Sequence, residues 1–124
     1  MKNMQITGTD STLNIVFSEE DNTLEISGSS LPLDAKEFYQ PIIQWINQYA
    51  QAYLNNIKVV FQLNYFNTAS SRYLLDIMVG VDGFITNGKH AKILWYYEKG
   101  DFEMLETGEE FADLVAVPFE FKTY

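Results

Sequence analysis

The segment 57–78 constrains the fold more than any other part of this chain, because two hydrophobic patterns meet within it. Residues 57–66 form a short and nearly continuous apolar run, which is typical of a strand buried on both faces of a parallel sheet. Apolar side chains then recur at helical spacing from Leu74 to Val81. The segment therefore predicts a buried central strand that leads directly into a helix.

A short polar turn, residues 67–71, separates the predicted strand from the predicted helix. In open α/β sheets, loops at the carboxyl ends of strands commonly carry function. The first turn of a helix also presents free N–H groups and a partial positive charge. This region therefore holds the candidate functional side chains, which are Asn64, Asn67, Thr68, Ser70 and Ser71.

The length and composition fit one domain over residues 1–124. The absence of cysteine excludes disulfides, thiolate nucleophiles and zinc–sulfur sites. The N-terminal segment lacks the apolar core of a signal peptide, and no stretch reaches the roughly 18 apolar residues of a membrane span. We therefore expect a cytoplasmic protein.

The charge is strongly negative, because eight basic and 17 acidic residues give a formal net charge of −9. Such a surface repels a nucleic-acid backbone or an anionic membrane, and the basic residues form no cluster in the sequence. We therefore expect neither nucleic acid nor membrane as a partner.

Two alternating stretches, residues 12–18 and 23–28, flank a polar turn and predict an N-terminal β-hairpin. Asp34, with Glu37 three residues later, forms a capping-box-like pair that predicts the start of a helix. Pro41 leaves two alternatives: a single turn before a helix that starts at Pro41, or one kinked helix. The predicted buried face of this helix comprises Phe38, Ile42, Trp45, Ile46, Tyr49 and Tyr53.

The helix that begins near Thr68 is expected to end at Asn87 and Gly88, which form a typical stop signal. Gly80 and Gly83 lie inside it, and glycine is unfavourable in a helix interior. We interpret these glycines as sites of close packing against the sheet or as an early end of the helix.

The C-terminal part predicts a strand over residues 91–97, a short helix starting from Thr107 and Glu110, and a last strand over 115–121. Pro118 places this last strand at an edge of the sheet. The order β-β-α-β-α-β-α-β defines an α/β fold: an N-terminal β-hairpin, then alternating helices and strands in a mixed, mostly parallel sheet with packed helices.

The sequence offers few parts for catalysis. His90 is the single histidine, its spacing does not place it beside Ser70 or Ser71, and the GxSxG motif is absent. The acidic pairs are expected to be solvated, and metal-ligand and phosphate-binding motifs are missing. We therefore expect neither enzymatic activity nor a cofactor or metal.

Two other functions stay open from the residues alone. Aromatic side chains near Trp95 and Tyr97 would suit a small-molecule-binding domain or an enzyme, although aromatics at strand periodicity are more often core residues. The edge strand at Pro118 would suit a structural oligomer.

The polar turn itself has two compatible interpretations. In the first, Asn67 or Thr68 is the N-cap, and Ser70 or Ser71 completes the first helical turn. In the second, a hydroxyl here is an exposed phosphoacceptor, because a phosphate is locally favourable at a helix N-terminus. A partner that buries the uncharged turn would be expelled by a phosphate that it cannot pair.

Three stretches, YFNTASSRYLLDI, LPLDAKEFYQPIIQWINQY and ETGEEFADLVAVPFEF, resemble the SiaC family of bacterial regulatory phosphoproteins. The similarity covers almost the whole chain from the hairpin onward, and the stretch that begins at Tyr65 is its most specific part. Members of this family look like SpoIIAA-type anti-sigma-factor antagonists, which are STAS-like domains. The resemblance therefore implies a SpoIIAA/STAS-like fold.

The resemblance also implies a partner-switching protein without chemistry of its own. A dedicated protein kinase would phosphorylate Thr68, a PP2C-type phosphatase would remove the phosphate, and Ser70 and Ser71 are the fallback acceptors. The unphosphorylated form would bind and activate a diguanylate cyclase, raising cyclic di-GMP and favouring biofilm; the alternative target is an anti-sigma factor. The expected partner-binding residues are Asn64, Asn67, Thr68, Ser70, Ser71 and Arg72.

Overall fold

The computed structural model describes residues 4–52 and 55–124. Strands and helices alternate after an N-terminal run of strands, as the hydrophobic patterns predict. The elements are β1 (Gln5–Ile6), β2 (Asn14–Ser18), β3 (Thr23–Ser30), α1 (Ala35–Ala52), β4 (Ile57–Phe66), α2 (Thr68–Thr86), β5 (Ala91–Tyr97), α3 (Phe102–Ala112) and β6 (Phe119–Thr123).

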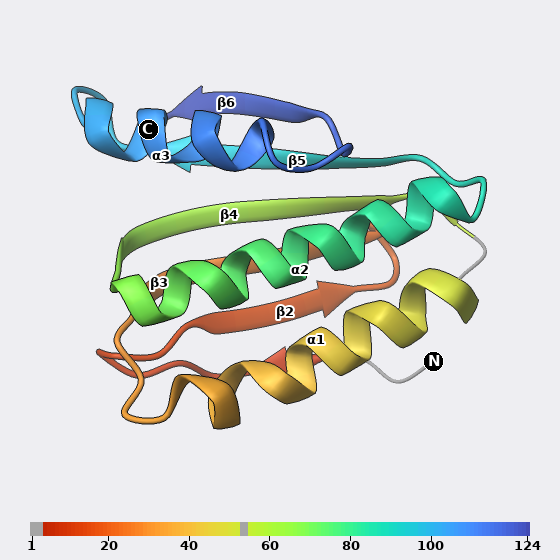
Figure 1. Ribbon diagram of the computed structural model, residues 1–124, viewed down its shortest axis with the longest axis horizontal. Helices are drawn as coiled ribbons and strands as arrows, with labels where there is room; N and C mark the ends of the chain where they lie inside the picture. Colours follow the sequence, from red (N-terminus) through yellow and green to blue (C-terminus); the bar gives the residue numbers. More distant parts are fainter. Residues whose placement is uncertain (1–3, 53–54) are drawn as a thin grey trace.

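The strands form one mixed sheet in the order β1-β2-β3-β4-β5-β6 (Figure 1). The β1–β2 and β2–β3 pairs are antiparallel, so the predicted hairpin is confirmed and a short extra strand extends it. The remaining neighbours pair in parallel, which confirms the mixed, mostly parallel sheet. The order follows from short crossovers, because each helix returns the chain to the next strand along the sheet.

All three helices cover the same face of the sheet, so the prediction that β4 is buried on both faces is wrong (Figure 1). Val59 and Phe61 are fully buried on the helix side, whereas Gln62 on the other side is exposed. α3 lies on the same side as α1 and α2, because Gly108 lies against the ring of Trp95, which pairs in register with Phe61. The opposite face is open. Val60 and Leu94 give it an apolar strip, which explains the continuous apolar run.

The two glycines inside α2 mark close packing, as predicted, but the packing partner is α1 rather than the sheet. A Cβ on Gly80 would lie 2.6 Å from Cγ2 of Ile46, and one on Gly83 would lie 3.2 Å from Cβ of Ala50. The helix continues past both glycines, and Asn87 is its C-cap. Glycine therefore allows α1 and α2 to approach each other closely.

α1 begins where the sequence predicts, because the Asp34 carboxylate accepts a hydrogen bond from the N–H of Glu37 at 3.1 Å. The helix is continuous through Pro41, so it does not start there. Its buried face includes Tyr39, whereas Phe38 is only partly buried. Tyr53, which was also expected on this face, lies outside the described residues.

The predicted cap at Thr107 is wrong, and the last strand, predicted over 115–121, exists but runs over Phe119–Thr123. The N-cap of α3 is Asp101, whose carboxylate accepts from the N–H of Met104, and the Thr107 hydroxyl donates to a carbonyl within the helix. β6 starts directly after Pro118 and lies at the edge of the sheet, the position that the proline predicted. The N–H groups of residues 116 and 117 bind the Asp82 carboxylate of α2 instead of a neighbouring strand.

Candidate functional site

The polar turn lies at the carboxyl end of β4, where Asn67 caps α2. Asn67 has an extended backbone conformation, and its side-chain oxygen accepts from the N–H of Ser70 at 2.9 Å. Its own N–H donates to the carbonyl of Ser30 at the end of β3. Asn67, rather than Thr68, is therefore the cap, and Thr68 is the first residue of α2.

Ser70 is not a surface hydroxyl, which separates it from the other candidate acceptors. It is fully buried, and its Oγ donates to Oδ1 of Asn67 at 2.7 Å. It also contacts the Oγ of Ser30, another fully buried serine, at 2.8 Å. The folded structure buries this hydroxyl, and the burial argues against the fallback role predicted for Ser70.

Thr68 and Arg72 are exposed on α2, one helical turn apart. Ser71 is half-buried, and its hydroxyl donates to the carbonyl of Thr68 at 2.7 Å. Asn64 is exposed at the end of β4 and lines a cavity of about 300 Å³ between this strand and α3. Thr68, Arg72 and Asn64 therefore form the accessible part of the predicted site, with Ser71 beside them.

His90 lies at the other end of the sheet from the turn. It immediately precedes β5, and its carbonyl accepts from the N–H of Ile57 at the first residue of β4. β4 has ten residues, so about 30 Å of strand separates this end from the turn. His90 therefore cannot act with Ser70 or Ser71. Among residues 4–52 and 55–124, no group of His, Cys, Asp or Glu side chains could hold a metal ion.

The aromatic side chains near the predicted ligand pocket are packed. Trp95 is fully buried, with its Nε1 donating to the carbonyl of Met104 at 3.0 Å. The rings of Phe61, Phe111 and Phe119 surround it, with centroids 5.7–6.4 Å away. The space around Trp95 is therefore filled by core side chains.

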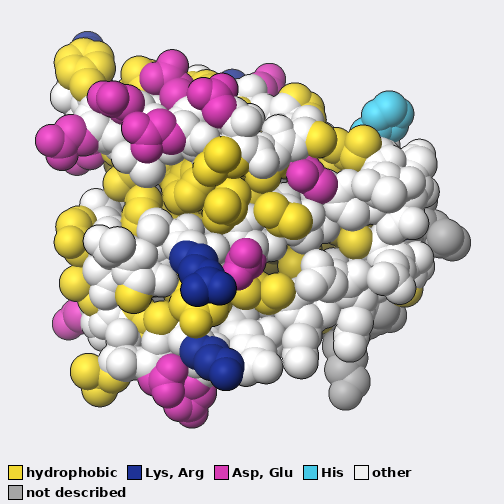
Figure 2. Space-filling view, viewed as in Figure 1, with side chains coloured by type: hydrophobic (Ala, Val, Ile, Leu, Met, Phe, Trp, Pro, Cys, Tyr) yellow, Lys and Arg dark blue, Asp and Glu magenta, His cyan; other side chains and the backbone are white. Residues whose placement is uncertain are grey.

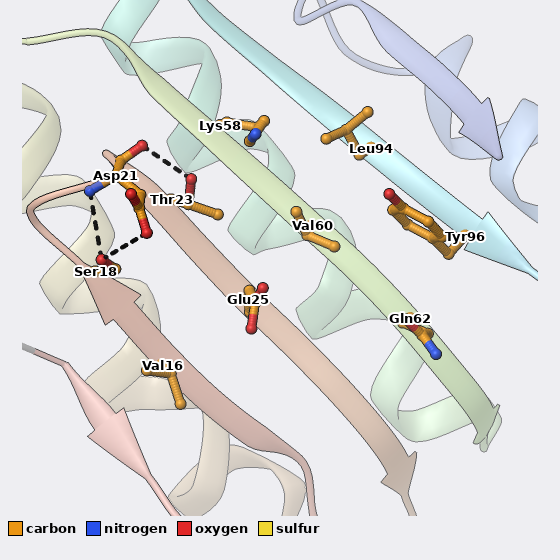
Figure 3. A pocket seen from close by; sticks show the side chains of 10 residues that line it. All are labelled: Val16, Ser18, Asp21, Thr23, Glu25, Lys58, Val60, Gln62, Leu94 and Tyr96. Atoms are coloured by element: carbon orange, nitrogen blue, oxygen red, sulfur yellow. Dashed lines mark hydrogen bonds between the residues drawn. The ribbon is translucent and has the colours of Figure 1, made fainter.

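The open face of the sheet carries a hollow of about 610 Å³, whose lining side chains come from β2, β3, β4 and β5 and from the β2–β3 turn (Figure 3). Glu25, Lys58, Gln62 and Tyr96 contribute polar groups to it. At one end, Asp21 holds the β2–β3 turn through hydrogen bonds with neighbouring residues. These polar groups belong to separate strands and show no convergent set that would suit a reaction.

The helical side of the molecule has an uneven charge distribution. Figure 2 shows acidic side chains gathered over α3 and a strip of hydrophobic atoms between α3 and α2. The acidic residues of α3 are Glu103, Glu106, Glu109 and Glu110, all exposed. A partner that covers this side must therefore tolerate or complement negative charge.

Three residues that matter for the turn and its helix were not identified from the sequence. Ser30 and Tyr39 are buried beneath the turn, and Asp82 ties α2 to the segment before β6. The burial of Tyr39 could have been predicted, because Tyr39 lies three residues before Ile42 and seven before Ile46, on the same helical face. Ser30 and Asp82 had no such signal, because their partners are distant in the chain.

No helix in the described part of the chain is both long and apolar enough to cross a membrane.

Comparisons with known proteins identify the family and relatives of this chain. Residues 6–124 match the family described as "SiaC family regulatory phosphoprotein". An uncharacterized protein of Pseudomonas aeruginosa (strain UCBPP-PA14) is 24% identical over 124 residues, which is all of this chain and 98% of the relative.

Two solved structures share the fold. SiaC of Pseudomonas aeruginosa superposes with a TM-score of 0.88 at 24% identity, over the full length of both chains. SiaC in the crystal structure of the diguanylate cyclase SiaD in complex with its activator SiaC, also from Pseudomonas aeruginosa, gives a TM-score of 0.90 at 24% identity, over 98% of this chain and 99% of that one. Because the family match spans nearly the whole chain, this protein belongs to the SiaC family of regulatory phosphoproteins.

Proposed function

We propose that this protein is a non-enzymatic switch in which reversible phosphorylation of Thr68 controls its binding to a diguanylate cyclase. The unphosphorylated form binds and activates the cyclase and so raises cyclic di-GMP. A protein kinase adds the phosphate and a PP2C-type phosphatase removes it. The observation that carries the proposal is an exposed threonine hydroxyl at the first residue of α2, inside a turn whose other polar groups are occupied.

The electrostatics of α2 support this role for Thr68. The first turn of α2 has no acidic residue, so the partial positive charge of the helix N-terminus is not compensated there. A phosphothreonine adds a charge of about −1.5 to −2 at neutral pH. Arg72, four residues later on the same helical face, can pair with that phosphate. The phosphorylated turn is therefore compatible with the fold, while its outer surface changes in charge and bulk.

The family relationship supports the choice of partner. The solved complex joins a SiaC protein to a diguanylate cyclase that it activates, and this chain belongs to the same family. In the described residues we find no metal-holding group, and the one histidine lies at the opposite end of the sheet from the serines. A binding role fits these features better than catalysis does.

The test combines phosphosite mapping with a binding assay. Protein purified from its own cells is analysed by mass spectrometry, with and without phosphatase treatment, and we expect a removable phosphate on Thr68. The unphosphorylated and phosphorylated forms are then compared for capture of a diguanylate cyclase and for stimulation of cyclic di-GMP synthesis. Thr68→Ala should carry no phosphate at this position and should still bind the cyclase. Ser71→Ala, which removes the neighbouring hydroxyl instead, is the matched control and should still be phosphorylated on Thr68. A phosphate confined to other residues, or equal cyclase binding by both forms, would contradict the proposal.

A further inference from the structure

A chain of hydroxyl groups runs through the interior directly beneath the Thr68 turn. Tyr39 of α1, Ser30 of β3 and Ser70 of α2 are all fully buried. The Ser30 Oγ lies 2.5 Å from the Tyr39 hydroxyl and 2.8 Å from the Ser70 Oγ. The Ser70 Oγ in turn donates to Oδ1 of Asn67 at 2.7 Å. These contacts join β3 and α1 to the cap of α2, and Ser30 lies 40 positions before Ser70 in the sequence.

A count of the available hydrogens shows that all the hydrogen bonds in this row of hydroxyl groups point the same way, from Tyr39 toward Asn67. Oδ1 of Asn67 carries no hydrogen and can only accept, and it also receives the N–H of Ser70. Ser70 has one hydroxyl hydrogen. Besides the Ser30 hydroxyl, its Oγ contacts Oδ1 of Asn67 and the Ser30 carbonyl, and neither of these two oxygens can donate. The Ser30 hydroxyl must therefore donate to Ser70, and the Tyr39 phenol must donate to Ser30.

We propose that Tyr39, Ser30 and Ser70 form a one-directional hydrogen-bond relay that positions the Asn67 cap and thereby presents Thr68 at the surface. We call these three residues the Tyr39 relay. They are positioning residues, since none of them would carry the phosphate. The regulatory meaning of the relay rests on the proposed function of Thr68, whereas its effect on the turn does not.

The surroundings of Tyr39 keep the relay in its donating form. Its ring is stacked on that of Tyr73, with centroids 5.4 Å apart and planes 3° apart, so the phenol is held in one orientation. Burial raises the pKa of Tyr39, while its hydrogen bonds with Ser30 and Ser70 act in the opposite direction. The phenol therefore keeps its proton at neutral pH and remains the first donor.

The backbone closes the relay into a ring around the turn. The N–H of Asn67 donates to the carbonyl of Ser30, and the N–H of Ser71 donates to the carbonyl of Asn67. Ser30 thus holds Asn67 directly through its backbone carbonyl, and indirectly through its side chain, which contacts the Ser70 hydroxyl that donates to Asn67. Because Thr68 directly follows Asn67, its position depends on side chains that are buried beneath the surface.

The experiment compares Tyr39→Phe and Ser30→Ala with the control Tyr73→Phe. Tyr73→Phe removes a hydroxyl from the neighbouring ring, which takes no part in the relay. Hydrogen exchange of the Ser70 and Ser71 amides is followed by NMR and compared with that of Ile77 in the middle of α2. We expect the relay variants to speed exchange at Ser70 and Ser71 by about two- to tenfold, the factor that corresponds to one net hydrogen bond. Exchange at Ile77 should change less, and Tyr73→Phe should leave all three amides unchanged.

A second readout separates positioning from stability. In cells, phosphate occupancy of Thr68 in Tyr39→Phe should fall relative to Tyr73→Phe at equal protein abundance. The relay is overturned if Tyr39→Phe speeds exchange at Ser70 and Ser71 no more than at Ile77, each relative to the wild type. It is also overturned if the wild type carries phosphate on Thr68 and the occupancy is equal in Tyr39→Phe and Tyr73→Phe. If faster exchange is found but no phosphate ever occurs on Thr68, the relay stands as a structural device and the proposed function fails. If wild-type Thr68 is phosphorylated but exchange is unchanged, only the relay fails.

Discussion

The two helices that follow parallel strands begin in similar ways but differ in what lies beneath and around their first turns. α2 follows β4 and is capped by Asn67; α3 follows β5 and is capped by Asp101, and each cap accepts from the N–H three residues later. The Asn67 cap is tied to buried groups of α1 and β3, whereas the oxygen of Asp101 binds only Met104 among the described residues. Capping alone is therefore common to both turns, and the buried relay distinguishes the first.

The two turns also differ in charge. α3 begins with the carboxylates of Asp101 and Glu103, which already compensate the positive end of the helix. The start of α2 has a neutral cap and no acidic residue. The first helical residue of α3 is the exposed Phe102, and that of α2 is the exposed Thr68. Only the α2 turn therefore offers a hydroxyl at a helix N-terminus that still favours an added negative charge.

The largest expected difference comes from removing the caps. Asn67→Ala should lower the free energy of unfolding by about 2 kcal/mol, because it removes the cap and also the nearer of the two acceptors of the buried Ser70 hydroxyl. Asp101→Ala should cost only about 1 kcal/mol, as for an ordinary cap. Urea unfolding of both variants measures the difference. Equal costs would mean that the relay adds nothing to the Asn67 cap.

The second comparison uses two neighbouring serines in the same turn. Ser70→Ala should cost about 1–2 kcal/mol, because the buried Ser30 hydroxyl loses its acceptor. Ser71→Ala should cost less than about 0.5 kcal/mol, because its hydroxyl is half-buried and bonds only a carbonyl in its own helix. Both values come from chemical denaturation monitored by tryptophan fluorescence. A larger loss for Ser71→Ala would reverse the assignment of the buried and accessible hydroxyls.

A smaller effect tests the charge difference between the turns. Thr68→Glu should raise the free energy of unfolding by about 0.3–1 kcal/mol at low ionic strength, because it compensates the positive end of α2. Phe102→Glu should give no such gain, since α3 already has Asp101 and Glu103 there. Thermal unfolding at low and high salt is the measurement. A gain at Thr68 that persists in high salt would point to a cause other than the helix field.

The smallest effect appears at high pH. The pKa of Tyr39 is raised above its ordinary value of 10.0 by burial. Below pH 10 the phenol is neutral in both folded and unfolded chains, so its full contribution to stability is present there. As the pH rises above 10, the unfolded chain loses this proton first, and stability falls until the folded pKa is passed. Stability curves from pH 8 to pH 11 should therefore decline less steeply for Tyr39→Phe than for the wild type.

Much of the fold could be predicted from the sequence, because it depends on neighbours in the chain. Alternation predicted the hairpin, helical spacing predicted α1 and α2, and Asp34 marked the start of α1. The predictions failed where distant groups compete with local ones. The segment before β6 is drawn away from the sheet by the Asp82 carboxylate, and α3 starts at Asp101 although Thr107 and Glu110 form a plausible local cap.

For the site, the sequence by itself determined which polar residues stand between β4 and α2 and that they cap a helix. Such hydrogen bonds span only a few residues, so the local order of side chains is sufficient. Only the tertiary structure decided that Ser70 is buried while Thr68 is exposed, and that Ser30 and Tyr39 lie beneath them. Ser30 and Ser70 are 40 positions apart. Their contact exists because β3 and β4 pair in parallel, which brings their carboxyl ends together at one edge of the sheet.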